Sequence, residues 1–249
     1  MGAGWPSAGS VRVALGARPA GRDDGSVASF VPPAARLREA LLDALALVLP
    51  VDCAGCGAPD RAVCADCRAA LAPAPVPAPR PGVDAWAGLA YAGPAARAIR
   101  SFKDEGRTDA APALAPALRA ALAAACTRLD DTSSLDVAVV PSTAAARRAR
   151  GYDPVRLLVR RAGFRPASVL RARDRADQAG LDREARRANA EGSLAPIARL
   201  DGRRFVLVDD VVTTGATLAD AARAIRSAGG SVEAIAVLAH TPRRFPCIT

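Results

Sequence analysis

Two adjacent carboxylates followed by a hydroxyl-rich loop form the most informative stretch of this 249-residue sequence, FVLVDDVVTTGATL from Phe205 to Leu218. An apolar run ends at Asp209 and Asp210, and residues 213–217 then open a segment with helical spacing. Backbone N–H groups at a helix start, together with threonine hydroxyls, make a site for an anion. Adjacent carboxylates repel a phosphate and instead suit a sugar diol or a hydrated metal ion. A phosphate site beside a diol site describes a ribose 5-phosphate.

Four cysteines form a second cluster with the spacing C-x2-C-x7-C-x2-C: Cys53, Cys56, Cys64 and Cys67. Four thiolates, each about 2.3 Å from one ion, close a tetrahedral site that has no open position. The spacing therefore predicts a structural zinc site, with iron, redox-active dithiols or no metal as the alternatives. Because the cluster is not basic, we interpret it as a metal site that stabilises a small module rather than as a module that binds nucleic acid. Two further cysteines, Cys126 and Cys247, have no partner motif and are interpreted as packing residues or free thiols.

The scarcity of lysine, histidine and aromatic residues excludes several classes of protein. The only lysine is Lys103, which lies in SFKDEG and not in the loop of a P-loop NTPase. The only histidine is His240, which excludes a zinc hydrolase with two histidines on one helix, and we interpret it as structural. Two tryptophans, two tyrosines and five phenylalanines are too few for an aromatic platform that stacks nucleic-acid bases.

The basic surplus of the chain is local. The chain carries 34 basic and 25 acidic residues, which give a net charge of +9. The segment from Arg147 to Arg187 has 13 arginines and five acidic residues, so it accounts for +8 of this net charge. Such a surplus favours anionic partners such as nucleic acid, phosphorylated metabolites or an anionic membrane surface. No apolar run reaches the roughly 18–20 residues of a membrane span, and no signal-peptide pattern is seen. We therefore expect a cytoplasmic protein without membrane insertion, in which six cysteines indicate metal binding or catalysis rather than disulfides.

Alternating strands and helices must position these residues, and the pattern predicts an α/β fold with a parallel sheet flanked by helices. The expected strands are residues 86–92, 135–140, 167–170, 204–210 and 231–240. The expected helices are residues 34–49, 93–103, 110–126, 152–163 and 216–229. The predicted units are an extension that is disordered or foreign to the fold (1–33), a helix with the cysteine module (34–71), a stiff proline-rich linker (72–82), the α/β domain (83–243) and a tail (244–249).

The stretch from Asp209 to Thr217 resembles the signature of the type I phosphoribosyltransferases, which use phosphoribosyl pyrophosphate (PRPP). The resemblance implies that Asp209 and Asp210 hold the ribose 2- and 3-hydroxyls. It also implies that the 5-phosphate is bound by Thr213, Thr214, Gly215, Ala216 and Thr217. Some nucleobase-salvage members have an aspartate base where this chain has Thr213, so no catalytic residue is assigned. Displacement at an oxocarbenium-like carbon depends on positioning and charge neutralisation more than on a protein nucleophile, so catalysis stays permitted.

The order of motifs over residues 36–240 resembles the ComF (competence protein F, GntX-like) family. The motifs are the cysteine pairs, YAGPAARAIRSFKDEG, VVPSTAAARRARGYD, DQAGLDREARRANAEGS and VDDVVTTGAT. The resemblance implies that residues 141–150 form the loop on the pyrophosphate side. The cations expected near the diphosphate are Lys103, Arg147, Arg148 and Arg150. The chain departs from the family at Val140-Pro141-Ser142, where Pro-Val-Pro is common, and at Tyr152-Asp153, where Phe-Asn is frequent.

The resemblance implies that the segment 171–191 lies where type I enzymes keep a mobile loop over the pyrophosphate, so we interpret it as a lid. Its matching residues are Arg171, Gln178, Arg186, Arg187 and Asn189, and the alternative to a lid is a solvated charged helix. Two functions remain open. The first is a PRPP-dependent transferase that releases pyrophosphate, with Mg²⁺ on the diphosphate. The second is a non-catalytic or PRPP-sensing competence protein that binds single-stranded DNA during natural transformation, with other competence proteins as partners.

Overall fold

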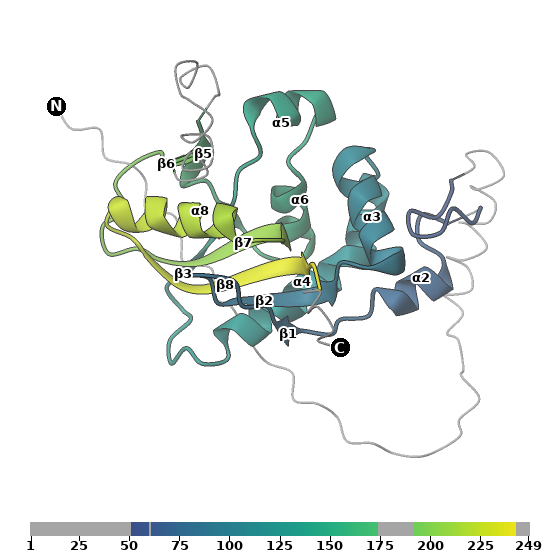
Figure 1. Cartoon of the computed structure of the whole chain (residues 1–249), viewed down its shortest axis with the longest axis horizontal. Coiled ribbons are helices and arrows are strands. Elements are labelled where there is room, and N and C mark those ends of the chain that lie inside the picture. The colour runs from purple at the N-terminus through teal and green to yellow at the C-terminus, as the bar shows by residue number, and fades with distance from the viewer. Residues whose placement is uncertain (1–50, 60, 174–191, 243–249) are drawn as a thin grey trace, which may run out of the picture.

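The computed structural model describes residues 51–59, 61–173 and 192–242. Its main sheet has six strands in the order β1-β2-β8-β7-β3-β4, and every neighbouring pair is parallel except β1 and β2. The strands are β1 (Val76–Pro77), β2 (Ala85–Ala90), β3 (Leu135–Val139), β4 (Pro166–Ala167), β7 (Arg204–Val212) and β8 (Ser231–His240). The predicted α/β class, with a mostly parallel sheet between helices, is confirmed (Figure 1).

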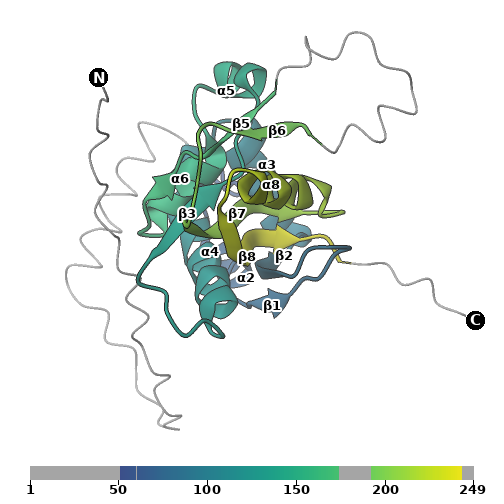
Figure 2. The same ribbon diagram turned by 90° about the vertical axis from the view of Figure 1, so that its left-hand side faces the viewer.

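Helices cover both faces of the main sheet. One face packs against α8 (Ala216–Ser227), and the other packs against α4 (Ala111–Cys126) and α6 (Pro154–Arg161) (Figures 1 and 2). Successive residues of β7 alternate between the two cores: Val206 and Val208 join the core of α4, whereas Phe205 and Leu207 join the core of α8. Burial on both faces explains why the central strands are continuous apolar runs.

Most strands and helices expected after residue 85 are confirmed to within a few residues. The single strand expected at residues 167–170 is wrong. β4 joins the main sheet, whereas β5 (Leu170–Ala172) pairs with β6 (Leu194–Pro196) in a separate two-stranded sheet. The loop expected at residues 141–150 contains a helix, α5 (Ala144–Arg150). The hydroxyl of Thr143 caps its first turn, and Gly151 with φ of 76° ends it, which are ordinary signals for helix limits.

Three expected segments lie outside the described residues: the extension 1–33, the helix 34–49 and the tail 244–249. The domain limits based on them therefore stay predictions. Within the part of the chain that the structure describes, no helix is both long and apolar enough to cross a membrane.

The proline-rich segment 72–82 is the outer arm of a β-hairpin, which corrects its expected role as a spacer. Val76 and Pro77 pair antiparallel with β2. At the tip, the N–H of Val83 donates to the carbonyl of Arg80 at 2.9 Å, and Gly82 has φ of 69°. Proline and glycine at the two central positions suit a tight turn of type II. The segment therefore belongs to the main sheet.

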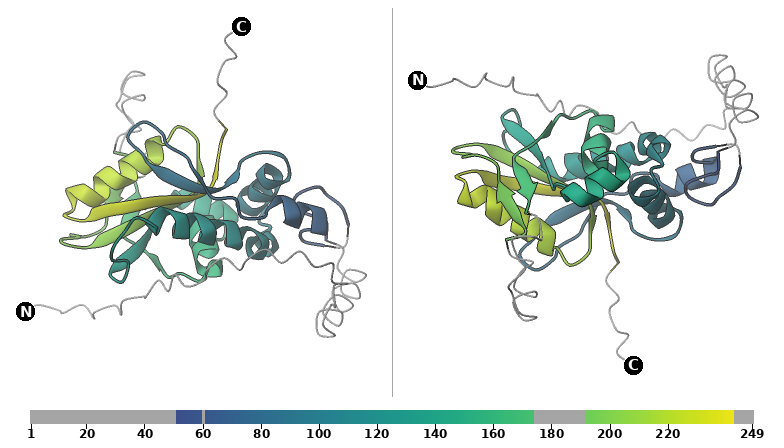
Figure 3. Two further views of the ribbon diagram at one scale, coloured as in Figure 1. Left: turned by 90° about the horizontal axis from the view of Figure 1, so that it is seen from below. Right: turned by 90° about the horizontal axis from the view of Figure 1, so that it is seen from above.

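The cysteine module, residues 51–71 with its helix α2 (Ala65–Ala70), packs against α3 (Gly93–Asp104), as the two views of Figure 3 show. A short 3₁₀ helix, η1 (Thr108–Ala110), follows α3. Buried residues of the module, among them Cys53 and Leu71, belong to the same apolar cluster as Ile99 and Phe102 of α3. The module thus shares a core with the sheet domain.

Candidate functional site

The candidate site lies where β7 ends and α8 begins. Asp210 is buried and Asp209 is half-buried near the end of β7. The Asp209 carboxylate accepts the N–H of Asp210 at 2.8 Å, and the Asp210 carboxylate accepts the N–H of Val211 at 2.7 Å. These local hydrogen bonds fix both carboxylates, so the predicted acidic pair is held in a defined orientation.

Thr213, Thr214 and Gly215 turn the chain from β7 into α8. Gly215 has φ of 86°, a left-handed conformation that favours glycine. The hydroxyl of Thr214 accepts the N–H of Ala216 at 3.3 Å, and Thr213, Thr214, Ala216 and Thr217 are exposed. The first N–H groups of α8 therefore lie beside exposed hydroxyls, as an anion site requires.

A cavity of about 490 Å³ opens over the end of the sheet and gathers side chains from four parts of the chain. Its polar lining comes from α3, from the segment after β3, from α5, and from the end of β7 with the loop and first turn of α8 that follow it. These polar residues are Arg100, Lys103, Asp104, Ser142, Thr143, Arg150, Asp209, Asp210, Thr213 and Thr217. Among the predicted phosphate-loop residues, Thr214, Gly215 and Ala216 adjoin this lining in sequence but are not part of it.

Lys103 is placed in the cavity against the acidic pair. Its Nζ lies 2.6 Å from an Asp210 carboxylate oxygen. Burial of the ammonium opposes its charge, but Asp210 and Asp209 outweigh this effect and raise the pKa of Lys103 above its usual value. Burial, and then the charge of Asp210, raise the pKa of Asp209 to about 8. The site therefore holds an ion pair of Lys103 with Asp210, beside a second carboxyl group whose pKa is raised.

The three predicted pyrophosphate-side arginines separate into two groups. Arg150 lines the cavity, and its Nη2 lies 3.1 Å from a carboxylate oxygen of Asp104 at the end of α3. Arg147 and Arg148 are exposed on α5 and do not line the cavity. The structure therefore joins Arg150 to Lys103 and the acidic pair, and it leaves the other two arginines outside.

Several lining residues were missed by sequence reasoning. The apolar wall contains Tyr91, Ile99 and Val155, and Arg100 and Asp104 add charge. Ile99 and Lys103 are four residues apart in α3, as are Arg100 and Asp104, so helical periodicity could have found them once Lys103 was chosen. A hydrogen bond also holds this helix in place, because the Tyr152 hydroxyl donates to the carbonyl of Phe102.

The remaining predicted residues either lie away from the cavity or fall outside the described residues. Arg171 is exposed in β5, whereas the other four lid residues, Gln178, Arg186, Arg187 and Asn189, lie outside the described residues. His240 ends β8, half-buried, and does not line the cavity. Cys126 is buried at the end of α4, while Cys247 lies outside the described residues.

The four predicted metal ligands meet at one point. The sulfur atoms of Cys53, Cys56, Cys64 and Cys67 all lie within 4.8 Å of one another, and those of Cys56 and Cys64 are 3.6 Å apart. Four sulfurs at 2.3 Å from a tetrahedral ion would be about 3.8 Å apart. Gly55 is required in this cluster, because a Cβ there would lie 2.6 Å from the Cys67 sulfur. The cluster can therefore hold a metal ion.

Backbone N–H groups favour a thiolate within this cluster. The Cys53 sulfur accepts N–H groups from Cys64 at 3.3 Å and from Gly55 at 3.4 Å. Burial alone would raise the pKa of the Cys53 thiol, but these N–H groups and that of Cys56 lower it to about 6. A metal ligand must be deprotonated, so the environment of Cys53 suits metal binding, whereas burial and the neighbouring cysteines raise the pKa of Cys67.

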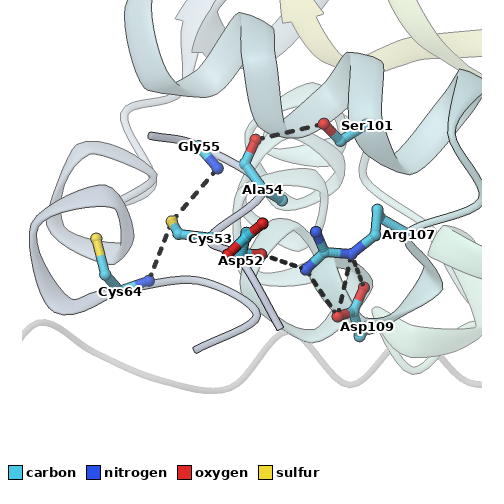
Figure 4. Close-up of polar contacts among 8 residues, drawn as sticks. All are labelled: Asp52, Cys53, Ala54, Gly55, Cys64, Ser101, Arg107 and Asp109. Carbon is cyan, nitrogen blue, oxygen red and sulfur yellow. Dashed lines mark hydrogen bonds and ion pairs between the residues drawn. The ribbon is translucent and has the colours of Figure 1, made fainter. Parts of the chain in front are cut away.

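Backbone carbonyls of residues 52–55, around the first cysteine pair, accept hydrogen bonds from α3 and from residues just after it (Figure 4). Arg97 donates to the carbonyl of Gly55, and the Ser101 hydroxyl lies 3.5 Å from the carbonyl oxygen of Ala54. Arg107 donates to the carbonyl of Asp52 at 2.7 Å and to the Asp109 carboxylate at 2.9 Å. The helix that carries Lys103 into the cavity is therefore anchored to the cysteine module.

Comparison with known proteins gives several matches. A family model described as "Phosphoribosyl transferase domain" matches residues 157–246. An adenine phosphoribosyltransferase of Clavibacter michiganensis is 38% identical over 135 residues, which cover 52% of this chain and 71% of that protein. An orotate phosphoribosyltransferase of Halorhodospira halophila is 34% identical over 70 residues, which cover 28% of this chain and 33% of that protein. A crystal structure of adenine phosphoribosyltransferase from Thermoanaerobacter pseudethanolicus aligns with a TM-score of 0.30 and 19% identity, over 68% of this chain and 84% of that one.

Proposed function

We propose, from the premise that this chain belongs to the phosphoribosyltransferase family, that it binds PRPP and transfers the phosphoribosyl group to an acceptor with release of pyrophosphate. One observation carries the proposal: the acidic pair, Lys103, Arg150 and the hydroxyls of Thr213 and Thr217 line a single cavity. This combination suits a ligand that has a diol and two separate phosphate groups. It favours PRPP over a simple nucleoside or an inorganic anion.

The residues have distinct roles in this proposal. The β7–α8 loop binds the 5-phosphate through N–H groups and hydroxyls, while Asp209 and Asp210 orient the ribose diol. Lys103 and Arg150 bind the diphosphate and neutralise the charge that develops on the leaving pyrophosphate. Bound Mg²⁺ would supply further charge neutralisation, and the Asp209 and Asp210 carboxylates are oxygen donors of the kind that it prefers.

The assignment is tested by calorimetry of PRPP with Mg²⁺ on the wild type and on the double variant Asp209→Asn/Asp210→Asn. We expect the affinity to fall about a hundredfold, because two carboxylates lose their contacts with the diol. The matched control is Asp136→Asn, an exposed carboxylate that pairs with Arg203 and does not line the cavity. Equal affinity in the wild type and the double variant would contradict the site.

Transfer itself is tested by release of pyrophosphate. Wild-type protein is incubated with PRPP, Mg²⁺ and a panel of nucleobases and amines, and we expect pyrophosphate only with a suitable acceptor. Tight binding of PRPP without release of pyrophosphate for any acceptor would instead favour a PRPP-sensing protein of the ComF type.

A second candidate function, binding of single-stranded DNA in natural transformation with competence proteins as partners, is favoured by α5. Arg147 and Arg148 are exposed there, and neither has an ion-pair partner among the described residues. Such free cations suit a phosphate backbone. Affinity for an oligonucleotide should fall steeply with salt, and charge reversal of both arginines should abolish it. An affinity that does not change with salt would exclude this function.

We also propose that the metal of the cysteine cluster is Zn²⁺ and that its role is structural. Four sulfur donors close the coordination shell and leave no position for a substrate. Elemental analysis of purified protein should give one zinc per chain, and Cys56→Ser should lose it whereas Cys126→Ser should not. Iron at this stoichiometry would contradict the assignment.

A further inference from the structure

Arg80 lies at the tip of the hairpin that the proline-rich segment forms, and its side chain is buried against the phosphate loop. The residue is 8% exposed. Its own N–H and carbonyl pair with Val83 at 2.8 and 2.9 Å, so the turn fixes its backbone. A buried guanidinium requires hydrogen-bond acceptors, because an unsatisfied charge in the interior is strongly unfavourable.

The guanidinium finds these acceptors on two loops that follow neighbouring strands. Its Nε donates to the carbonyl of Thr213, directly after β7. Its Nη2 donates to the carbonyl of Thr241, directly after β8, at 2.8 Å, and its Nη1 donates to the carbonyl of Pro79 at 3.0 Å. One side chain therefore ties the phosphate loop to the end of the adjacent strand and to the hairpin.

The loop is also packed against the aliphatic part of Arg80. A Cβ on Gly215 would lie 2.7 Å from the Cβ of Arg80. Gly215 therefore serves two purposes, since it adopts a left-handed conformation and lets the loop approach this arginine closely. The side chain supports the loop from its buried side.

The contact with Thr213 determines which way one peptide group faces. All described peptide bonds are trans, and the carbonyl and N–H of a trans peptide point in opposite directions. Because the carbonyl of Thr213 points to buried Arg80, the N–H of Thr214 points away from it, towards the exposed side of the loop. In the proposed function, that side is the one from which the 5-phosphate approaches.

We propose that Arg80 is a positioning residue for the 5-phosphate site: it holds the Thr213–Thr214 peptide with its N–H directed at the phosphate. The inference rests on the proposed function, because it takes the β7–α8 loop as the phosphate site. Arg80 does not line the cavity, so it acts through the loop and does not touch the ligand. Pyrophosphate, which we place at Lys103 and Arg150, should be unaffected by Arg80.

The test compares two ligands on two variants. Calorimetry is done with ribose 5-phosphate and, separately, with pyrophosphate and Mg²⁺, on wild type, Arg80→Met and Arg80→Lys. Both variants should bind ribose 5-phosphate about tenfold or more weakly, because a misoriented donor is lost at the phosphate. Both should bind pyrophosphate within about twofold of the wild type. Arg199→Met, which removes an exposed arginine paired only with Asp201 among the described residues, is the control and should change neither affinity.

The outcomes separate the inference from the function on which it rests. Wild-type protein that binds neither PRPP nor ribose 5-phosphate would overturn both. Wild-type binding that both Arg80 variants retain would overturn the inference alone. An equal loss for the two ligands, or a lower melting temperature with both affinities kept, would make Arg80 merely structural and overturn it too. If Arg80→Met does not fold, the test rests on Arg80→Lys. Lysine keeps the positive charge, but its single ammonium group cannot donate to the carbonyls of Thr213 and Thr241 together as the planar guanidinium does.

Discussion

At the scale of single residues, the contact between Lys103 and Asp210 places a positive charge against the acidic pair of the site. The chain has 33 arginines and one lysine, and that lysine is 2.6 Å from a carboxylate of the acidic pair. A compact ammonium fits against a carboxylate without the planar requirement of a guanidinium. The ammonium is paired with Asp210. In the proposed function, this cation would already be in place when a diphosphate binds.

The ionisation of Asp209 predicts how stability depends on pH. The unfolded chain releases this proton near pH 4, whereas the folded protein keeps it until about pH 8. The free energy of unfolding should therefore fall between these two values and level off above pH 8. Asp209→Asn removes this dependence. The free energy of unfolding of the variant, relative to that of the wild type, should therefore be about 1–3 kcal/mol higher at pH 8.5 than at pH 5.

Urea unfolding at several pH values measures this difference. The control is Asp201→Asn, because hydrogen bonding to Arg199 lowers the pKa of Asp201, so this carboxylate affects the pH dependence of stability only at pH values below 3.8. The stability curve of Asp201→Asn should therefore run parallel to that of the wild type from pH 5 to pH 8.5. Stability curves for Asp209→Asn and the wild type that run parallel from pH 5 to pH 8.5 would contradict the raised pKa.

The separation of the three arginines predicts different effects on pyrophosphate binding. Arg150→Ala should weaken binding of pyrophosphate with Mg²⁺ about tenfold or more, because a charge-assisted hydrogen bond is worth about 1.5–3 kcal/mol. Arg147→Ala is the matched control, since it lies one helical turn away on α5 and is outside the cavity. Calorimetry that gives equal losses for the two variants would show that α5 as a whole, and not Arg150, attracts the anion.

At the scale of elements, α3 joins the metal cluster to the cavity. One side of this helix is bonded to the cysteine module through Arg97 and Ser101, and another carries Lys103 to the acidic pair. The helix is short and exposed on part of its surface, so its position depends on these neighbours. The module thus acts as a support for a wall of the cavity.

Removal of the metal should therefore loosen α3. We expect a chelator to lower the melting temperature by about 5 °C or more and to increase amide exchange in residues 97–104. Exchange in α8, on the other face of the sheet, is the internal control and should change little. Equal increases in both helices would indicate general unfolding instead.

Local signals account for what could be predicted at this scale. The acidic pair and its loop are contiguous in sequence, so their chemistry could be read directly. The limits of α5 are also encoded locally, by the cap residues Thr143 and Gly151. Arg80 could not be found in this way, because 133 residues separate it from Thr213 and only the sheet order brings them together.

At the scale of the whole molecule, one of the two apolar cores extends from the cysteine cluster through α3 and α4 to α6. Buried residues of the module, of α3, of α4 and of β7 belong to a single cluster. The predicted boundary in the proline-rich segment followed from composition, which cannot distinguish a linker from a hairpin with a Pro-Gly turn. The packing favours one cooperative unit.

Thermal unfolding should accordingly be a single transition when the metal is bound. We expect the calorimetric and van't Hoff enthalpies to agree, because the module cannot expose its core without disturbing α3. Differential scanning calorimetry measures both quantities. Two resolved transitions would indicate that residues 34–71 unfold as a separate domain.

The hairpin around Arg80 also bears on how the protein can be divided for expression. A boundary placed at residue 83, where composition alone would start the α/β domain, removes β1 and Arg80 together. β2 would then become the edge of the sheet with its backbone groups unpaired, a template for aggregation. The loop after β7 would lose its support in the same cut. A fragment that begins before Ala74, whose N–H donates to the carbonyl of Gly88, would keep both.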